Sequence, residues 1–167
     1  MRGIVDGTLQ VGDMAADFEL PALIDGVRKT FRLSDHCGKT VLLAFYPFNW
    51  QEASVRQMAA YQAQRQRWQR NSIEIAAVSV ESIMNTTAWE RRCGPFDFTL
   101  CSDFWPHGEV SAQYGAFRSS GPAAGECERA VVIVDAAGRI AFRRIYARDE
   151  VPPLDDLFNV LAGAGLG

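Results

Sequence analysis

Residues 41–57 read Val-Leu-Leu-Ala-Phe-Tyr-Pro-Phe-Asn-Trp-Gln-Glu-Ala-Ser-Val-Arg-Gln, and this stretch decides the fold. The run Val41–Tyr46 is apolar or aromatic throughout, which is typical of a strand covered on both faces of a sheet. Pro47 ends that strand, because proline has no backbone N–H to donate. A helix is expected to follow from about Ala53 to Arg70. The stretch therefore predicts a strand–turn–helix junction.

Strand and helix patterns continue on both sides of this junction. Further strands are expected at 18–20, 28–33, 73–80, 130–134 and 139–146, with turns at Asp25-Gly26 and at 135–138. Further helices are expected at 83–92, 108–114 and 154–162. On the helix 53–70 we expect inward-facing side chains at Val55, Met58, Ala59, Tyr61 and Trp68. Strands that alternate with helices and close with a hairpin indicate an α/β fold with a mixed central sheet.

Composition narrows the classes of partner. The 167 residues suit one domain spanning 1–167, and 48% apolar residues are ordinary for a globular protein. A net charge of −3 gives no reason to expect nucleic acid as a partner, and no apolar run suits a membrane span. The first residues contain no apolar signal segment, so we expect a cytoplasmic protein. The four cysteines and two histidines show no metal-binding spacing, so neither a metal nor a cofactor is expected.

The junction resembles the active-site junction of peroxiredoxins of the alkyl hydroperoxide reductase / thiol-specific antioxidant family. In that family the stretch reads Pro-x-x-x-Thr/Ser-x-x-Cys, often with Glu three residues after the Cys. Here Pro47 is present, whereas Gln51, Ser54 and Gln57 stand where the Thr, the Cys and the Glu belong. Residues 11–18, 31–39 and 129–135 carry the resemblance further, and 102–108 with 114–115 resemble the one-Cys alkyl hydroperoxide reductase E branch. The resemblance implies a thioredoxin-like fold of the peroxiredoxin type and a homodimer.

The resemblance also implies a reaction for which this chain lacks the usual atom. In the family a cysteine thiolate attacks peroxide and becomes a sulfenic acid. A serine hydroxyl is far less acidic than a thiol, and its oxygen has no comparable oxidised state. We therefore expect no peroxide reduction at Ser54. Three alternatives stay open: an engineered Cys-to-Ser form of a thiol-dependent peroxidase, a displaced nucleophile at Cys127 that uses a thiol reductant, and a redox-dead structural partner.

The leading hypothesis is a repurposed pocket that binds, or acts without redox chemistry on, a small oxygenated or carboxylate-bearing molecule, in a specialised biosynthetic pathway. Arg129 and the helix N–H groups would hold its oxygen atoms. Ser54, Gln51 and Glu52 are the other catalytic candidates, with Glu52 as a base. Binding candidates complete the set: Tyr46, Pro47, Trp50, Trp105, His107 and Cys127.

Plainer interpretations accompany these candidates. Ser54 can simply cap the helix, and Arg129 can be a structural ion-pair partner of Glu52 or Glu128. Cys127 lies two residues before Arg129, so on an extended segment both side chains would point the same way. The neighbouring Glu126 and Glu128 would raise the pKa of Cys127.

Overall fold

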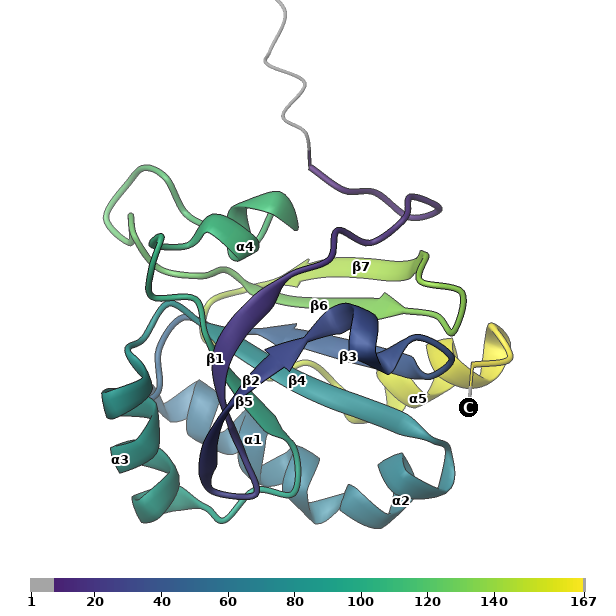
Figure 1. Cartoon of the computed structure of the whole chain (residues 1–167), viewed down its shortest axis with the longest axis horizontal. Helices are drawn as coiled ribbons and strands as arrows, with labels where there is room; N and C mark the ends of the chain where they lie inside the picture. The colour runs from purple at the N-terminus through teal and green to yellow at the C-terminus, as the bar shows by residue number, and fades with distance from the viewer. Residues whose placement is uncertain (1–7, 167) are drawn as a thin grey trace, which may run out of the picture.

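The computed structural model describes residues 8–166, and its centre is a seven-stranded mixed sheet (Figure 1). The strand order is β2-β1-β5-β4-β3-β6-β7, with β3, β4 and β5 parallel and the remaining neighbours antiparallel. The strands are β1 (Glu19–Ile24), β2 (Val27–Arg32), β3 (Thr40–Phe45), β4 (Ile73–Ser79), β5 (Thr99–Ser102), β6 (Arg129–Val134) and β7 (Ile140–Tyr146). This arrangement confirms the predicted α/β fold with a mixed sheet.

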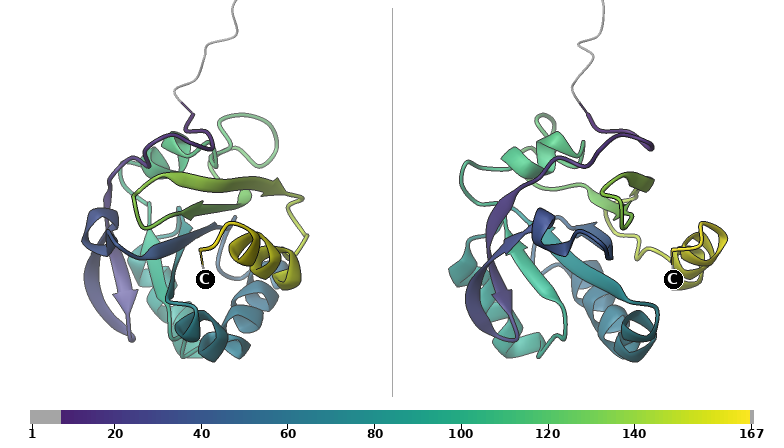
Figure 2. Two further views of the ribbon diagram at one scale, coloured as in Figure 1. Left: turned by 90° about the vertical axis from the view of Figure 1, so that its right-hand side faces the viewer. Right: turned by 45° about the vertical axis from the view of Figure 1, so that its right-hand side comes forward.

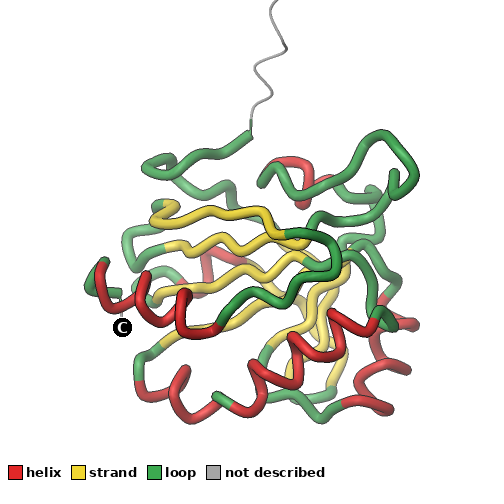
Figure 3. The backbone as a smooth tube through the Cα atoms, turned by 180° about the vertical axis from the view of Figure 1, so that it is seen from behind, coloured by secondary structure: helices red, strands yellow, loops and turns green. Residues whose placement is uncertain are grey.

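Helices cover both faces of the sheet. The helical elements are η1 (Leu33–His36), α1 (Glu52–Ala63), α2 (Arg65–Arg70), α3 (Ile83–Cys93), α4 (Glu109–Gln113) and α5 (Leu154–Gly163). Figures 2 and 3 show α1, α2 and α5 on one side of the sheet, which we call the α1 face. The opposite side, the α4 face, carries η1 and α4. Within residues 8–166, no helix is both long and apolar enough to cross a bilayer.

The middle strands β3 and β6 are buried along their whole length, as the unbroken apolar pattern predicts. Their side chains alternate between two core clusters. From β3, Leu42 and Ala44 join the cluster on the α1 face, with Met58, Tyr61, Trp68, Trp89 and Phe158. Val41, Leu43 and Phe45 join the cluster on the α4 face, with Phe18, Phe31, Val110 and Tyr114.

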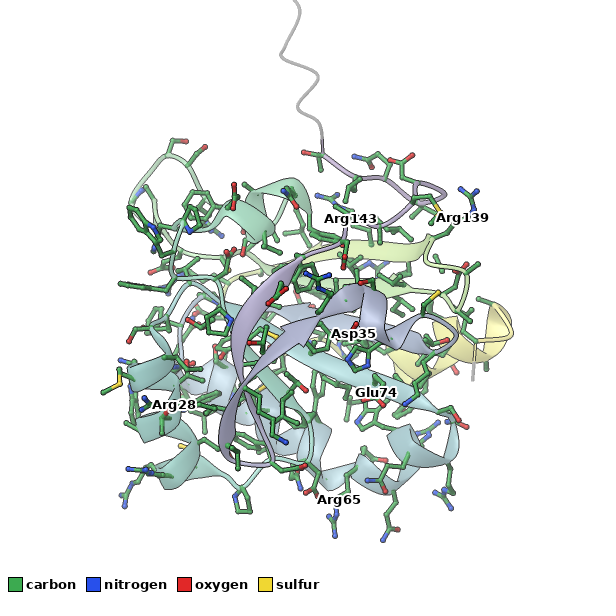
Figure 4. The ribbon with its side chains drawn as sticks, viewed as in Figure 1. Arg28, Asp35, Arg65, Glu74, Arg139 and Arg143 are labelled. Carbon is green, nitrogen blue, oxygen red and sulfur yellow. The ribbon has the colours of Figure 1, made fainter. Side chains whose placement is uncertain are left out.

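Both predicted hairpin turns are confirmed. At the β1–β2 turn, Asp25 and Gly26 have φ values of 53° and 71°, the left-handed backbone that a two-residue turn of this kind requires. This hairpin packs on α3, where Arg28 donates from Nε to Thr87 Oγ1 at 3.4 Å (Figure 4). At the β6–β7 turn, one oxygen of Asp135 accepts from the N–H groups of Ala137 and Arg139.

The structure corrects the sequence-based expectation at two elements. The helix expected from Ala53 to Arg70 is two helices, because the backbone breaks at Gln64, which has φ −101° and ψ 15°. The break lets Trp68 donate from Nε1 to the carbonyl of Tyr61 and stack on Phe158. Strand β5 was not predicted, since four residues are too few to show a period. Ala59, expected to face inward, is exposed.

Candidate functional site

A buried polar network shapes the turn between β3 and α1. The hydroxyl of Tyr46 donates to Oδ1 of Asn49 at 2.7 Å, and Nδ2 of Asn49 donates to Asn85 and Thr86 at the start of α3. Tyr46 and Asn49 are both fully buried, so these bonds have no competition from water. The network fixes where Gln51 ends the turn and where α1 begins. Tyr46 is therefore a scaffold residue of the turn in this structure.

Arg129, the first residue of β6, reaches α1 with a fully buried guanidinium. Nη1 donates to Oε1 of Gln57 at 2.6 Å. Nη2 donates to Oε1 of Gln51 at 2.8 Å and to Oγ of Ser54 at 3.1 Å. Nε donates to the carbonyl of Arg148 at 2.9 Å. We call Gln51, Ser54, Gln57 and Arg129 the Arg129 cluster.

All the acceptors of Arg129 are neutral. Within residues 8–166 the guanidinium has no carboxylate within ion-pair distance, and the two glutamates proposed as its partners bind elsewhere. Glu52 lies 3.9 Å from Arg56, and Glu128 lies 2.9 Å from Arg118. The interpretation of Arg129 as an ion-pair partner of Glu52 or Glu128 is therefore wrong. Burial lowers the pKa of Arg129 to about 10, so it still carries its charge at neutral pH.

Ser54 lies in the first turn of α1 and does not cap the helix. Its hydroxyl donates to Oε1 of Gln51 at 3.3 Å and accepts from Arg129. No side chain caps α1 at its N-terminus. The plain interpretation of Ser54 as a helix cap is thus wrong, because its hydroxyl serves the Arg129 cluster instead.

The Arg129 cluster is closed. Ser54, Gln57 and Arg129 are 0% exposed and Gln51 is 9% exposed. Four surface cavities lie elsewhere, and none is lined by a member of the cluster. One of about 320 Å³ lies beside α2, between Arg65 and Glu74, which Figure 4 labels. Any ligand of Arg129 must therefore displace a side chain, and Gln51 is the outermost.

Several of the predicted site residues lie apart from the cluster. The side chain of Glu52 is 87% exposed, so it is not placed as a base for Ser54. Trp105 is 81% exposed, and Trp50 points outward and donates from Nε1 to Asn85. His107 contacts the carbonyls of Phe104 and Gly125. Pro47 is buried in the turn itself. The exposed side chains of Trp50 and Trp105 do not form walls around Arg129.

Cys127 lies on the opposite side of the sheet from the guanidinium. It is fully buried in the core cluster of the α4 face, with its sulfur 3.2 Å from Oγ of Ser111. The expected shared direction with Arg129 is wrong, because regular strand geometry begins only at Arg129. Burial raises the pKa of Cys127 to about 12, and Glu126 contributes least of the causes. The structure thus gives Cys127 none of the features of a reactive thiolate.

Two residues of the site were not identified from the sequence. Gln57 was identified as the motif position where the family has Glu, and it follows Ser54 by three positions on the buried side of α1. Arg148 and Asp149 follow β7 and come beside Gln51 only through the fold. No sequence pattern links them to the junction. Among residues 8–166, no three His, Cys, Asp or Glu side chains gather as metal ligands.

Comparison with known proteins defines the class. The model of the AhpC/TSA family matches residues 11–143. Peroxiredoxin-2 of Mus musculus is 30% identical over 152 residues, which cover 87% of this chain and 73% of that protein. The selenocysteine-containing peroxiredoxin PrxU of Peptoclostridium acidaminophilum is 31% identical over 138 residues, covering 79% and 66%. This chain belongs to the AhpC/TSA family of peroxiredoxins.

Solved structures support the same fold. Mycobacterium tuberculosis AhpC superimposes with a TM-score of 0.84 at 22% identity, covering 95% of this chain and 99% of that one. Enterococcus faecalis AhpC superimposes with a TM-score of 0.85 at 22% identity, covering 95% and 93%. The predicted thioredoxin-like fold of the peroxiredoxin type is confirmed.

Proposed function

We propose that this chain is a peroxiredoxin-family protein that does not reduce peroxides. In this proposal Ser54 takes the position of the peroxidatic cysteine, and Arg129 binds a small oxygenated or carboxylate-bearing molecule. The observation that carries the proposal is the buried guanidinium whose protein acceptors are all neutral. Buried charges in proteins are usually paired with an opposite charge. The carboxylate of a ligand would supply the missing one.

The energetics favour exchange of a neutral acceptor for an anion. The bonds from the guanidinium to its neutral acceptors are already charge-assisted, because the donor is ionised. A carboxylate that replaced the Gln51 amide on Nη2 would add the attraction of a full negative charge at a site already dehydrated. Its cost is the loss of the bonds that Gln51 makes, and Gln51 is the most accessible member of the cluster.

The contacts of Ser54 support binding over covalent catalysis. Its hydroxyl bonds only to Gln51 and Arg129 within the cluster, and neither is a base at neutral pH. Glu52, the expected base, points into solvent. In the proposal Ser54 donates a hydrogen bond to an oxygen of the ligand. Sulfur chemistry has no support at either position, since Ser54 has no sulfur and Cys127 is buried on the other face.

Two measurements test this proposal. Hydrogen peroxide consumption with dithiothreitol as reductant should be no faster than in a Ser54→Ala control. Calorimetric titration with acetate and other small carboxylates should show binding that disappears in Arg129→Gln. Turnover lost in Cys127→Ala would establish the displaced nucleophile instead. The natural coding sequence, if it has a cysteine at position 54, would establish the engineered form.

The homodimer implied by the family is part of the proposal. Exposed apolar side chains follow the carboxyl ends of the three neighbouring parallel strands β3, β4 and β5, along the border of the sheet that these strand ends form. They are Trp50, Met84, Phe104 and Trp105. We call these four the apolar edge. A second copy that covers it would bury surface that a monomer rarely leaves in water.

A role in specialised biosynthesis and a cytoplasmic location complete the proposal. The first follows from the carboxylate chemistry inferred for Arg129, and the second is the location expected from the sequence. A redox-dead structural role is the competing outcome. Full biological activity of Arg129→Gln and Ser54→Ala variants, together with loss of activity when the apolar edge is altered, would establish that role.

A further inference from the structure

The Gln51 side chain is bound inside the fold in the way a protein binds a small ligand. Its Oε1 accepts from Arg129 Nη2 at 2.8 Å and from Ser54 Oγ at 3.3 Å. Its Nε2 donates to Asp149 Oδ1 at 2.9 Å and to the carbonyl of Arg148 at 3.3 Å. Both ends of the carboxamide are therefore recognised: the oxygen by donors and the nitrogen by acceptors.

The groups at the two ends carry opposite charges. Arg129 is a buried cation without a carboxylate partner among the described residues. Asp149 is 84% exposed, and its other charged contact is with the guanidinium of Arg148 at 3.8 Å. A neutral amide bridges the cation and the anion but neutralises neither. A ligand with a negative oxygen group beside a positive nitrogen group would satisfy the same contacts with bonds between opposite charges.

We propose that the ligand of the Arg129 site is a small zwitterionic amino acid, whose carboxylate replaces Gln51 Oε1 on Arg129 and whose ammonium group replaces Gln51 Nε2 on Asp149. This inference rests on the proposed function, because it assigns the chemical class of the carboxylate bound there. Ser54 donates the second hydrogen bond to the carboxylate oxygen, as it now donates to Gln51 Oε1. The carbonyl of Arg148 accepts from the ammonium group, as it now accepts from Gln51.

The placement of these groups also limits the size of the ligand and determines which carboxylates the site accepts. The buried end of the site offers the volume that the Gln51 side chain now occupies, so the ligand has a small head group. The remainder of the ligand extends toward solvent past the exposed Asp149. A second carboxylate at that rim would meet the negative charge of Asp149, so the site discriminates against dicarboxylates.

The Gln51→Ala variant makes the inference testable by chemical rescue. It removes the internal carboxamide and leaves Arg129, Ser54 and Asp149 in place. Four probes of similar size divide the chemistry: glycine carries both charges, acetate the carboxylate, methylammonium the ammonium, and acetamide neither. Gln62→Ala is the matched control, because Gln62, on α1, also bonds an aspartate, Asp97, but contacts no buried arginine.

Calorimetry on the full chain should show glycine binding to Gln51→Ala about tenfold more tightly than acetate, as one added charge-assisted bond implies. Glycine should not bind Gln62→Ala. In the double variant Gln51→Ala/Asp149→Asn, the affinity for glycine should fall to the affinity for acetate. If Gln51→Ala binds acetate and glycine with equal affinity, the zwitterion proposal is overturned and the carboxylate proposal stands. Acetamide as the tightest probe would overturn the zwitterion as well. Binding by none of the four probes, in a variant that remains folded by circular dichroism, would overturn both proposals.

Discussion

Nη1 of Arg129 donates to Oε1 of Gln57 across 2.6 Å, although 72 residues separate them in the chain. The amide of Gln57 also donates from Nε2 to the hydroxyl of Tyr61 at 3.0 Å. Gln57 is thus oriented from both sides in a dry environment, and it presents a neutral oxygen where a carboxylate would neutralise the arginine. This relationship keeps the positive charge of Arg129 available to a ligand.

Gln57→Glu should therefore weaken carboxylate binding. A glutamate at this position would place a carboxylate beside Nη1, where it would compete with any external anion. We expect affinity for acetate or glycine to fall by about tenfold or more, measured by calorimetry in the Gln51→Ala background. Gln62→Glu, the same substitution at a position of α1 outside the Arg129 cluster, should leave the affinity unchanged. Equal losses in both variants would show that a general charge effect on α1 is responsible.

Arg129→Met should destabilise the fold. The substitution leaves the oxygens of Gln51, Ser54 and Gln57 buried without their common donor. Loss of these bonds should lower the free energy of unfolding by about 3 kcal/mol, within the range for unsatisfied buried polar groups. Urea denaturation measures this change. Arg143→Met, on the neighbouring strand β7, is a control with a partly exposed arginine that bonds only backbone carbonyls.

A cysteine introduced at position 54 alone should not give rapid thiol chemistry. In Ser54→Cys the thiol would lie beside Arg129, which favours the thiolate, but the Gln51 carboxamide would still close the site. We expect Ser54→Cys/Gln51→Thr to react with a small alkylating reagent at least about tenfold faster than Ser54→Cys, as measured by mass spectrometry. Such a factor corresponds to about 1.4 kcal/mol of the barrier. Equal rates would show that Gln51 does not control access.

The pH dependence of stability should include a contribution from Glu90. Burial raises the pKa of this carboxyl above its ordinary range, with a smaller contribution from Asp25. The folded state therefore holds the proton more tightly than the unfolded chain does. Stability from this group is present below the unfolded pKa of about 4.3 and is lost as pH rises through the raised folded value.

Glu90→Gln should remove the loss of stability that Glu90 causes as the pH rises. The variant should melt at a higher temperature than the parent protein at pH 7 and at a similar temperature at pH 4. Thermal denaturation across this range measures the difference. Asp103, whose pKa burial also raises, is the same in both proteins, so its effect cancels. A constant difference between the two proteins at all pH values would contradict the assignment to Glu90.

Trp105→Ser should weaken self-association. The side chain is 81% exposed at the apolar edge, and a large aromatic anchor at an interface commonly contributes about 2 kcal/mol or more. Analytical ultracentrifugation should then show the dimer dissociating at a concentration about 30-fold higher than for the parent protein. Val27→Ser is a control at an exposed apolar residue on the edge strand β2. A monomeric parent protein would contradict the proposed dimer directly.

The sequence was informative where one local pattern corresponds to one element. The apolar run before Pro47 identified β3, and the Asp25-Gly26 pair identified the β1–β2 hairpin. Local pattern failed at Gln64, where the backbone leaves helical geometry, and at β5, which is too short to show alternation. It also failed for Trp50 and Trp105, because aromatic character does not say whether a side chain meets the site or the solvent.

By itself the sequence determined the α/β fold, the family resemblance and the presence of an alcohol at position 54, since each depends on residue identity and short-range spacing. Tertiary structure alone decided what surrounds Arg129. Its partners come from α1, from the residue before α1 and from the segment after β7, and only folding brings them within hydrogen-bond distance and removes water from between them. The identity of Arg129 as a cation follows from the sequence. That no carboxylate among the described residues pairs with its guanidinium is a property of the packed structure.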